Sequence, residues 1–162
     1  MTLLRSLAAG TAAGAVGTAA LNVATYADMA VRGRAESEMA GKLVKNVASS
    51  AGLSALTRDD ETSQHRRSAL GALLGYGNGL GVGILYAMIR PLLPRRISVP
   101  VAALVVGAAA MALSDVPATK TGATDPAKWS PGDWLADAIP HGIYGAAVVL
   151  AVEGLRSRED AG

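Results

Sequence analysis

The chain has 162 residues and a formal net charge of +2, with no Cys and no Phe. Hydrophobic residues make up 51% of it, and only 17% of the residues are Asp, Glu, Lys or Arg, against roughly 25% in soluble proteins. The lack of Cys excludes a disulfide framework and thiolate chemistry, and the small, unclustered positive charge argues against nucleic acid as a partner. Long apolar stretches without charges predict an integral membrane protein whose surroundings are the lipid bilayer.

Four apolar segments are candidates to cross a bilayer, whose hydrocarbon core of about 30 Å requires about 20 helical residues. Their uncharged windows cover residues 6–27, 68–89, 97–114 and 138–152. With their flanks, they predict transmembrane helices at about 6–31, 68–90, 97–114 and 133–155. We therefore expect an all-α membrane protein, a single domain over residues 1–162 with about four transmembrane helices. A cleaved signal peptide is the alternative for the first segment, which is longer than a typical signal-peptide apolar region.

The connection between the first two segments predicts one amphipathic surface helix at about 35–56. Its apolar residues recur every four positions, at Met39, Leu43, Val47 and Ala51, with polar side chains on the opposite side. Such a helix would lie along the membrane surface or cap the bundle, and a soluble helical hairpin is the alternative. Residues 57–67, which carry many charges, are expected to form a solvated turn.

The other two connections are short or rich in turn-forming residues. Pro91 and Pro94 predict a tight hairpin between the second and third segments, because proline does not continue a helix interior. The connection before the fourth segment places Trp129 and Trp134 where interfacial anchors are expected. Lys and Arg occur on both sides of the predicted bundle, so the positive-inside rule leaves the orientation open.

Small residues recur every four positions in the first two segments. The second segment has Gly71, Gly75, Gly79 and Gly83, and the first has Gly10 and Gly14, followed at the same spacing by Thr18 and Asn22. This spacing lets helix backbones approach closely, which favours helix association in lipid. Two interpretations stay open: packing of these two helices within one chain, which we favour, and homo-oligomerisation through the second helix.

The fourth segment carries ionisable residues on one helical face. Asp133, Asp137 and His141 are four residues apart, so their side chains stack, and Gly145 continues this face without a side chain. Pro140 is expected to kink the helix beside His141. The wider set of candidates for a polar path or a structural network comprises Asn22, Tyr26, Asp28, Asp133, Asp137, His141, Tyr144 and Glu153.

Depth in the membrane separates these candidates. Asp133, beside Trp134, is expected at the interface as a helix cap, whereas Asp137 and His141 lie deeper, where an ionised acid costs about 2.5–3.5 kcal/mol. That pair is suited to proton relay, to metal binding with Asp28 or Glu153, or to acid–base catalysis. We favour a structural pair that holds this helix against the first one. With two His in the chain, a metal site is the weakest interpretation, and we expect no cofactor.

No G-x-S-x-G, H-E-x-x-H or P-loop motif is present, so we do not expect an enzyme. The order Asp133-x-x-x-Asp137-x-x-Pro140-His141-x-x-Tyr144, the loop rich in Pro and Trp before it and the basic Pro hairpin resemble the YagU-like family of small bacterial inner-membrane proteins. The resemblance covers residues 76–158. Pro140 stands where Gly is expected, and the acids are Asp where Glu is usual. The resemblance implies a multi-pass protein of the bacterial cytoplasmic membrane and no defined reaction.

These features together predict a non-enzymatic envelope accessory or interaction protein, whose partner is another membrane protein or a second copy of the chain. The alternative is a small oligomeric transporter or channel in which Asp137, His141 and Asp28 line a polar path. A lipid-modifying membrane enzyme is the least expected of the three.

Overall fold

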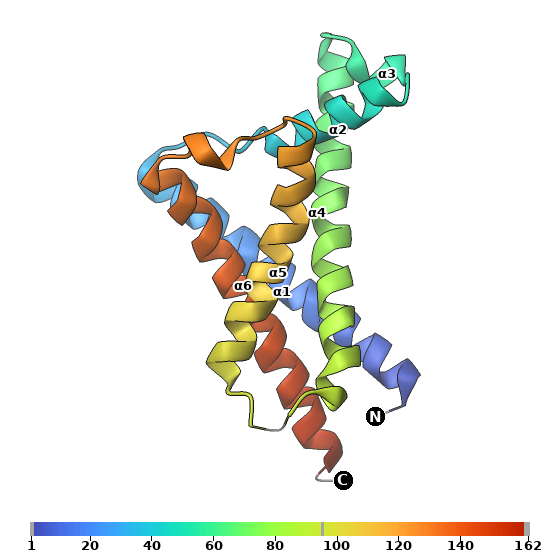
Figure 1. Cartoon of the computed structure of the whole chain (residues 1–162), viewed down its shortest axis with the longest axis vertical. Coiled ribbons are helices and arrows are strands. Elements are labelled where there is room, and N and C mark those ends of the chain that lie inside the picture. Colours follow the sequence, from blue (N-terminus) through green and yellow to red (C-terminus); the bar gives the residue numbers. More distant parts are fainter. Residues whose placement is uncertain (1, 95, 161–162) are drawn as a thin grey trace.

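The computed structural model describes residues 2–94 and 96–160 and consists of helices joined by short connections, with no strand in this part of the chain. The four long helices are α1 (Leu3–Arg32), α4 (Glu61–Ile89), α5 (Val99–Lys120) and α6 (Pro131–Asp160). The shorter elements are α2 (Met39–Ser50), α3 (Ser54–Thr57) and the 3₁₀ turns η1 (Arg90–Leu92) and η2 (Pro126–Lys128). The two chain ends lie at one end of the bundle, with α2 and α3 at the other (Figure 1).

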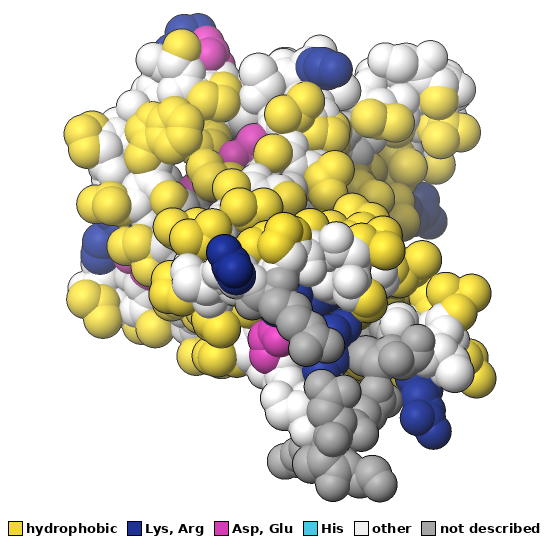
Figure 2. All heavy atoms as spheres, turned by 60° about the horizontal axis from the view of Figure 1, so that its bottom comes forward, with side chains coloured by type: hydrophobic (Ala, Val, Ile, Leu, Met, Phe, Trp, Pro, Cys, Tyr) yellow, Lys and Arg dark blue, Asp and Glu magenta, His cyan; other side chains and the backbone are white. Residues whose placement is uncertain are grey.

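All four long helices are long and apolar enough to cross a membrane, which confirms the predicted all-helical fold with four helices of spanning length. At 1.5 Å per residue, the 22 residues of α5 reach about 33 Å. Only 28–33% of the most apolar stretch of each helix is buried. Most apolar side chains therefore point outward, and Figure 2 shows hydrophobic side chains across the middle of one face.

The helices pack mainly in three pairs: α1 with α4, α1 with α6, and α5 with α6. In the first pair, Gly10 and Gly14 of α1 lie against Gly79 and Gly83 of α4; a methyl group on Gly83 would lie 2.6 Å from the carbonyl oxygen of Gly10. Glycine thus allows backbone to touch backbone. The sequence leaves two partners open for the repeated glycines of α4: α1 of the same chain, which we favour, and a second copy. This structure contains the contact with α1.

The α4 ladder is divided in the structure. Gly79 and Gly83 face α1, and Gly71 faces Ala40 of α2, but a methyl group on Gly75 would meet no described atom within 4 Å. Gly75 therefore differs from the prediction that all four glycines form one packing face. The reason is that α1 crosses α4 at an angle (Figure 1), so it contacts α4 only around Gly83 and Gly79. Helix α2 contacts α4 nearer its start, at Gly71, and Gly75 lies between the two contacts.

A second glycine contact, which the sequence analysis missed, joins α5 and α6. A methyl group on Gly107 would lie 2.6 Å from the carbonyl oxygen of His141, and one on Gly145 would lie 2.6 Å from the backbone nitrogen of Gly107. The open space expected at Gly145 is therefore occupied by the α5 backbone. The core between the helices consists of small and β-branched residues with two tyrosines, including Val82, Tyr86, Val106, Tyr144, Val148 and Val152.

The predicted amphipathic helix over 35–56 is shorter and divided in the structure. Helix α2 ends where Gly52 adopts a left-handed conformation, φ 69°, and the short α3 follows. The Leu53 and Gly52 amides donate to the carbonyls of Ala48 and Ser49, the pattern of a Schellman ending. The α2 helix caps the bundle, because Asn46 Nδ2 donates to the Thr121 carbonyl at 2.8 Å.

Helix α4 begins earlier than expected, since residues 61–67, predicted as a solvated turn, form its first two turns. Asp60 caps this end by accepting a hydrogen bond from the Ser63 backbone N–H at 2.8 Å. That bond holds the pKa of the Asp60 carboxyl below its usual value. The Ser63 side chain is buried and donates to the Ala55 carbonyl, so packing against α3 stabilises a helical turn in a charged sequence.

Helix α5 also continues beyond its predicted end at residue 114, through Pro117 to Lys120. The charge of Asp115 predicts that it flanks the segment, but this residue is buried beside α6 and does not end the helix. The Thr121 hydroxyl donates to the Pro117 carbonyl at 2.9 Å, and Gly122, φ 75°, then turns the chain away.

We expect Gly83→Ala to lower the thermal stability of the bundle, because the added methyl group would overlap the α1 backbone. Overpacking of this kind costs about 1–3 kcal/mol. Gly81→Ala is the matched control, since a methyl group there meets no described atom within 4 Å. Thermal unfolding followed by circular dichroism in nanodiscs measures both; equal melting temperatures for the two variants would contradict the assigned contact.

Candidate functional site

The chemically most distinctive part of the bundle is a group of three ionisable residues between α5 and α6, here called the acid–imidazole cluster: Asp115, Asp137 and His141. Asp137 and His141 are one turn apart on α6, with His141 Nδ1 lying 3.2 Å from Asp137 Oδ1 and 2.9 Å from the Asp137 carbonyl oxygen. Asp115 approaches them from α5, and its carboxyl is close enough to that of Asp137 for the two to interact. Helical spacing predicts the α6 pair, but it does not predict Asp115, which belongs to another helix.

The cluster is largely shielded from solvent. Asp115 is 8% exposed, and the side chains of Asp137 and His141 are 21% and 14% exposed. Oδ2 of Asp137 is buried and has no hydrogen-bond partner among the described residues. Two neighbouring carboxylates cannot hydrogen-bond unless one of them carries a proton. A proton on either carboxyl would provide the missing donor, so the cluster can hold a shared proton and exchange it with the His141 ring.

The glycine contact between α5 and α6 brings the cluster together. Gly107 lies two turns before Asp115, and Gly145 lies one turn after His141, so the close backbone approach there brings the two faces within side-chain reach. Pro140 is buried within α6 without ending it. Because proline has no N–H, the Ala136 carbonyl lacks its usual helical donor, which leaves another polar group beside the cluster.

Tyr144 belongs to a different part of the bundle. It is 1% exposed, and its hydroxyl donates to the Gly79 carbonyl of α4 at 2.6 Å. Its ring lies against Gly17 of α1, where a methyl group would come 2.8 Å from the ring. Tyr144 therefore joins three helices through packing and one buried hydrogen bond, and does not contact the acid–imidazole cluster in the interactions described.

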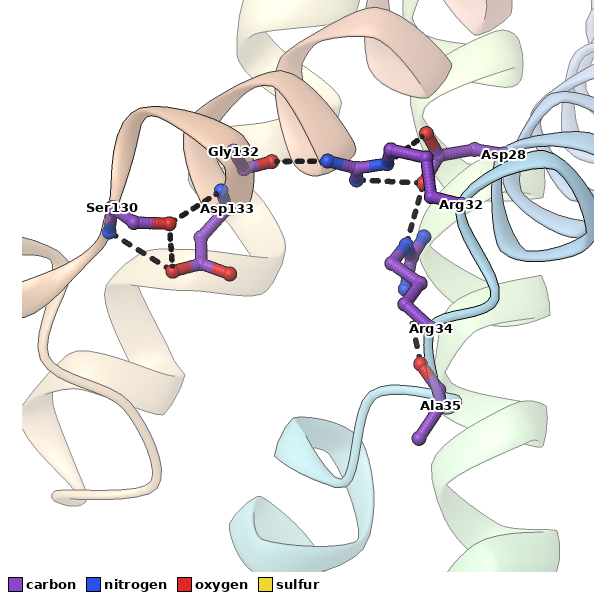
Figure 3. Close-up of polar contacts among 7 residues, drawn as sticks. All are labelled: Asp28, Arg32, Arg34, Ala35, Ser130, Gly132 and Asp133. Carbon is purple, nitrogen blue, oxygen red and sulfur yellow. Dashed lines mark hydrogen bonds and ion pairs between the residues drawn. The ribbon is translucent and has the colours of Figure 1, made fainter.

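Asp28 and Asp133 lie in a surface network that joins the end of α1 to the start of α6 (Figure 3). Asp28 forms ion pairs with Arg32 at 2.7 Å and with Arg34 at 2.5 Å, and Arg32 also donates to the Gly132 carbonyl at 3.3 Å. Asp133 accepts from the Ser130 backbone N–H at 2.9 Å, while its own N–H donates to the Ser130 hydroxyl at 3.2 Å. This reciprocal bonding is a helix cap, and Asp28 is paired with arginines rather than with Asp137.

Glu153 lies in a third polar group, near the other end of the bundle. It accepts a hydrogen bond from the Tyr86 hydroxyl at 3.2 Å and forms an ion pair with Arg90. Tyr26 is 57% exposed and Asn22 is half-buried, and neither side chain has a hydrogen bond within the described part of the chain. The eight candidates therefore do not form one network, and the residues missed by the sequence analysis are Asp115, Arg90 and Tyr86.

The additional metal ligands suggested from the sequence do not lie with the acid–imidazole cluster. The described residues contain no group of three or more His, Cys, Asp or Glu that could hold a metal ion. Asp28 and Glu153, suggested as additional ligands, are each paired with arginine and lie in other groups. The cluster is thus two carboxyls and one imidazole, a set suited to holding a proton.

We expect Asp115→Asn to retain or increase thermal stability, whereas Asp115→Ala should lower it. An amide at this position supplies an N–H donor to the unpartnered oxygen of Asp137, but alanine leaves that oxygen unsatisfied, at a cost of about 1–3 kcal/mol. Melting temperatures of the two variants in nanodiscs at neutral pH provide the comparison. If asparagine proves as destabilising as alanine, the two carboxyls do not share a proton.

No family model, curated protein or solved structure matches this chain. The likeness of residues 76–158 to the YagU-like family therefore stays a prediction from the sequence.

Proposed function

We propose that this chain is a multi-pass accessory protein of a bacterial cytoplasmic membrane, which acts by binding a second membrane protein. The compartment is supported by the resemblance to the YagU-like family. The binding role is supported by the unit formed by α2 and α3, here called the α2–α3 cap, residues 39–57. The cap is held firmly on the bundle and presents apolar side chains away from it.

The attachment of the cap involves several independent contacts. Arg67 of α4 donates to the carbonyls of Leu56 and Arg58 at 3.0 and 2.8 Å, and Gly71 of α4 lies against Ala40. Val44 and Ala48 of α2 are also buried. These contacts, with the Asn46 hydrogen bond to the Thr121 carbonyl, fix the orientation of the cap relative to the bundle.

The outer side of the cap is suited to a protein partner. Val47 and Leu53 are 51% and 53% exposed, so their apolar surface is available on a preordered support, which reduces the entropy lost on binding. The charges beside them are already paired, Lys42 with Glu38 and Lys45 with Asp59, at 3.1 and 2.6 Å. The surface therefore favours an apolar contact over a strongly charged one. Preordered apolar side chains on the cap are the observation that carries this proposal.

A photocrosslinking amino acid at Val47 or Leu53 should yield covalent adducts with one defined protein in the native membrane. The same amino acid at Leu104, which is 70% exposed on α5, is the control for random contact within the bilayer. Mass spectrometry of the purified adducts identifies what each position touches. The proposal fails if the cap positions give no protein adduct, or if Leu104 gives the same ones.

A proton-linked transporter is the second candidate, supported by the acid–imidazole cluster in the interior of the bundle. Buried ionisable residues in membrane helices often mark ion pathways. Glycine contacts hold α1 against α4 and α5 against α6 at backbone distance. A proton path through the bundle would therefore require these helices to separate. The cluster can bind a proton in the closed form, which is the first step that such a transporter needs.

The transporter candidate predicts proton flux into liposomes that contain the purified chain, measured with an enclosed pH-sensitive dye. Asp137→Asn should abolish most of this flux, because it removes one of the two carboxyls that share a proton. Asp133→Asn is the control, since Asp133 caps the start of α6 and lies outside the cluster. Flux no greater than in protein-free liposomes, or equal flux in both variants, would exclude this role for the cluster.

A further inference from the structure

An open groove of about 430 Å³ runs along the outer side of α5 and ends at the connection to α6. Its inner part is lined by Ala108 and Ala112, and its mouth by Thr119, Lys120 and Trp134. The α5 residues that line it recur at intervals of three and four, so they share one face of the helix. The small side chains of the two alanines leave the hollow beside this face.

The length of the groove corresponds to one leaflet of a bilayer. From Ala108 to Lys120 the helix advances about 18 Å, at 1.5 Å per residue. Half of a hydrocarbon core of about 30 Å is about 15 Å. A molecule that follows the groove from its mouth inward therefore extends from the headgroup level to near the centre of the membrane, as a single phospholipid does.

Three hydrogen-bond donors at the mouth have no acceptor within the described part of the chain. They are the Lys120 ammonium, the Thr119 hydroxyl and the Trp134 indole N–H. Nearby polar side chains differ in this respect: Lys128 is paired with Asp125 at 3.0 Å, and Trp129 Nε1 donates to the Thr124 hydroxyl at 2.9 Å. The two tryptophan rings touch edge to face, 5.0 Å between centroids, which holds Trp134 at the mouth.

The acid that lines the groove lies deeper than the mouth. Asp115 is five residues before Lys120, about 7.5 Å further along the helix axis. Its carboxyl accepts a hydrogen bond from the Ser114 hydroxyl at 3.4 Å and lies beside Asp137, and the residue is only 8% exposed. Asp115 therefore offers little negative charge at the mouth of the groove.

We propose that this groove binds one anionic phospholipid of the surrounding bilayer. Its phosphate accepts hydrogen bonds from Lys120, Thr119 and Trp134, and one acyl chain lies along α5 over Ala112 and Ala108. The charge of Lys120 selects an anionic headgroup over a zwitterionic one, and the apolar inner part contacts the chain. This site is independent of the partner proposed for the α2–α3 cap.

The test is native mass spectrometry of the full chain released from nanodiscs made of equal amounts of phosphatidylglycerol and phosphatidylcholine. The wild-type chain should retain phosphatidylglycerol in preference. Lys120→Gln should reduce that retention about five-fold, the effect of one lysine at a membrane surface. Lys128→Gln is the matched control, because Lys128 is paired with Asp125 and does not line the groove. Ala112→Leu, which fills the groove, should also reduce retention.

A second measurement uses the two tryptophans of the chain. In a Trp129→Phe variant, Trp134 fluorescence should be quenched more strongly by phosphatidylglycerol with brominated acyl chains than by brominated phosphatidylcholine, and Lys120→Gln should remove that difference. Circular dichroism verifies that each variant retains its helices.

Three results would overturn the proposal. Equal retention of both lipids would show contact with the bilayer without headgroup selection. Equal losses in Lys120→Gln and Lys128→Gln would show a general effect of surface charge. Unchanged retention in Ala112→Leu would place the lipid outside the groove.

Discussion

The approach of α1 to α4 at backbone distance is the contact on which the rest of this structure depends. Lipid gives little hydrophobic force between helices, so packing and interhelical hydrogen bonds must hold them together. Gly10 and Gly14 against Gly79 and Gly83 bring two backbones into contact. The same absence of side chains lets Tyr144 of α6 lie on Gly17 and donate to the Gly79 carbonyl. One glycine contact thereby positions a third helix.

The polar residues are arranged around this tightly packed centre according to their depth. Near the ends of the bundle, arginines neutralise the acids: Asp28 pairs with Arg32 and Arg34 at one end, and Glu153 pairs with Arg90 toward the other. In the acid–imidazole cluster, no described arginine or lysine forms an ion pair with the two carboxyls, and the imidazole of His141 lies beside Asp137 instead. Burial without a permanent cation is what makes this cluster the chemically responsive part of the molecule.

The α2–α3 cap and the α5 groove meet at the same end of the bundle. Asn46 of the cap donates to the carbonyl of Thr121, the residue directly after Lys120 at the mouth of the groove. The connection that follows carries Trp129, whose ring supports Trp134. The cap, the headgroup position and the start of α6 are therefore joined by one short segment. By contrast, the opposite end holds the chain termini and the tight turn around Pro91 (Figure 1).

The sequence by itself determined the class of fold, because crossing a bilayer requires long, predominantly apolar helices, and the chain contains four segments of that kind. It also indicated the small-residue faces of α1 and α4 and the Asp137–His141 pair, since helical periodicity places such residues on one face. Tertiary structure decided which faces meet. Gly75 belongs to the same four-residue repeat as Gly79, but a methyl group on it would meet no described atom within 4 Å. Gly107 belongs to no predicted ladder, and yet it packs against the backbone of α6. The sequence predicts that Asp115 ends a segment, because its interaction with Asp137 of α6 becomes visible only in the tertiary structure. Periodicity is a property of one helix, but crossing angles and partners depend on the surfaces of several helices together.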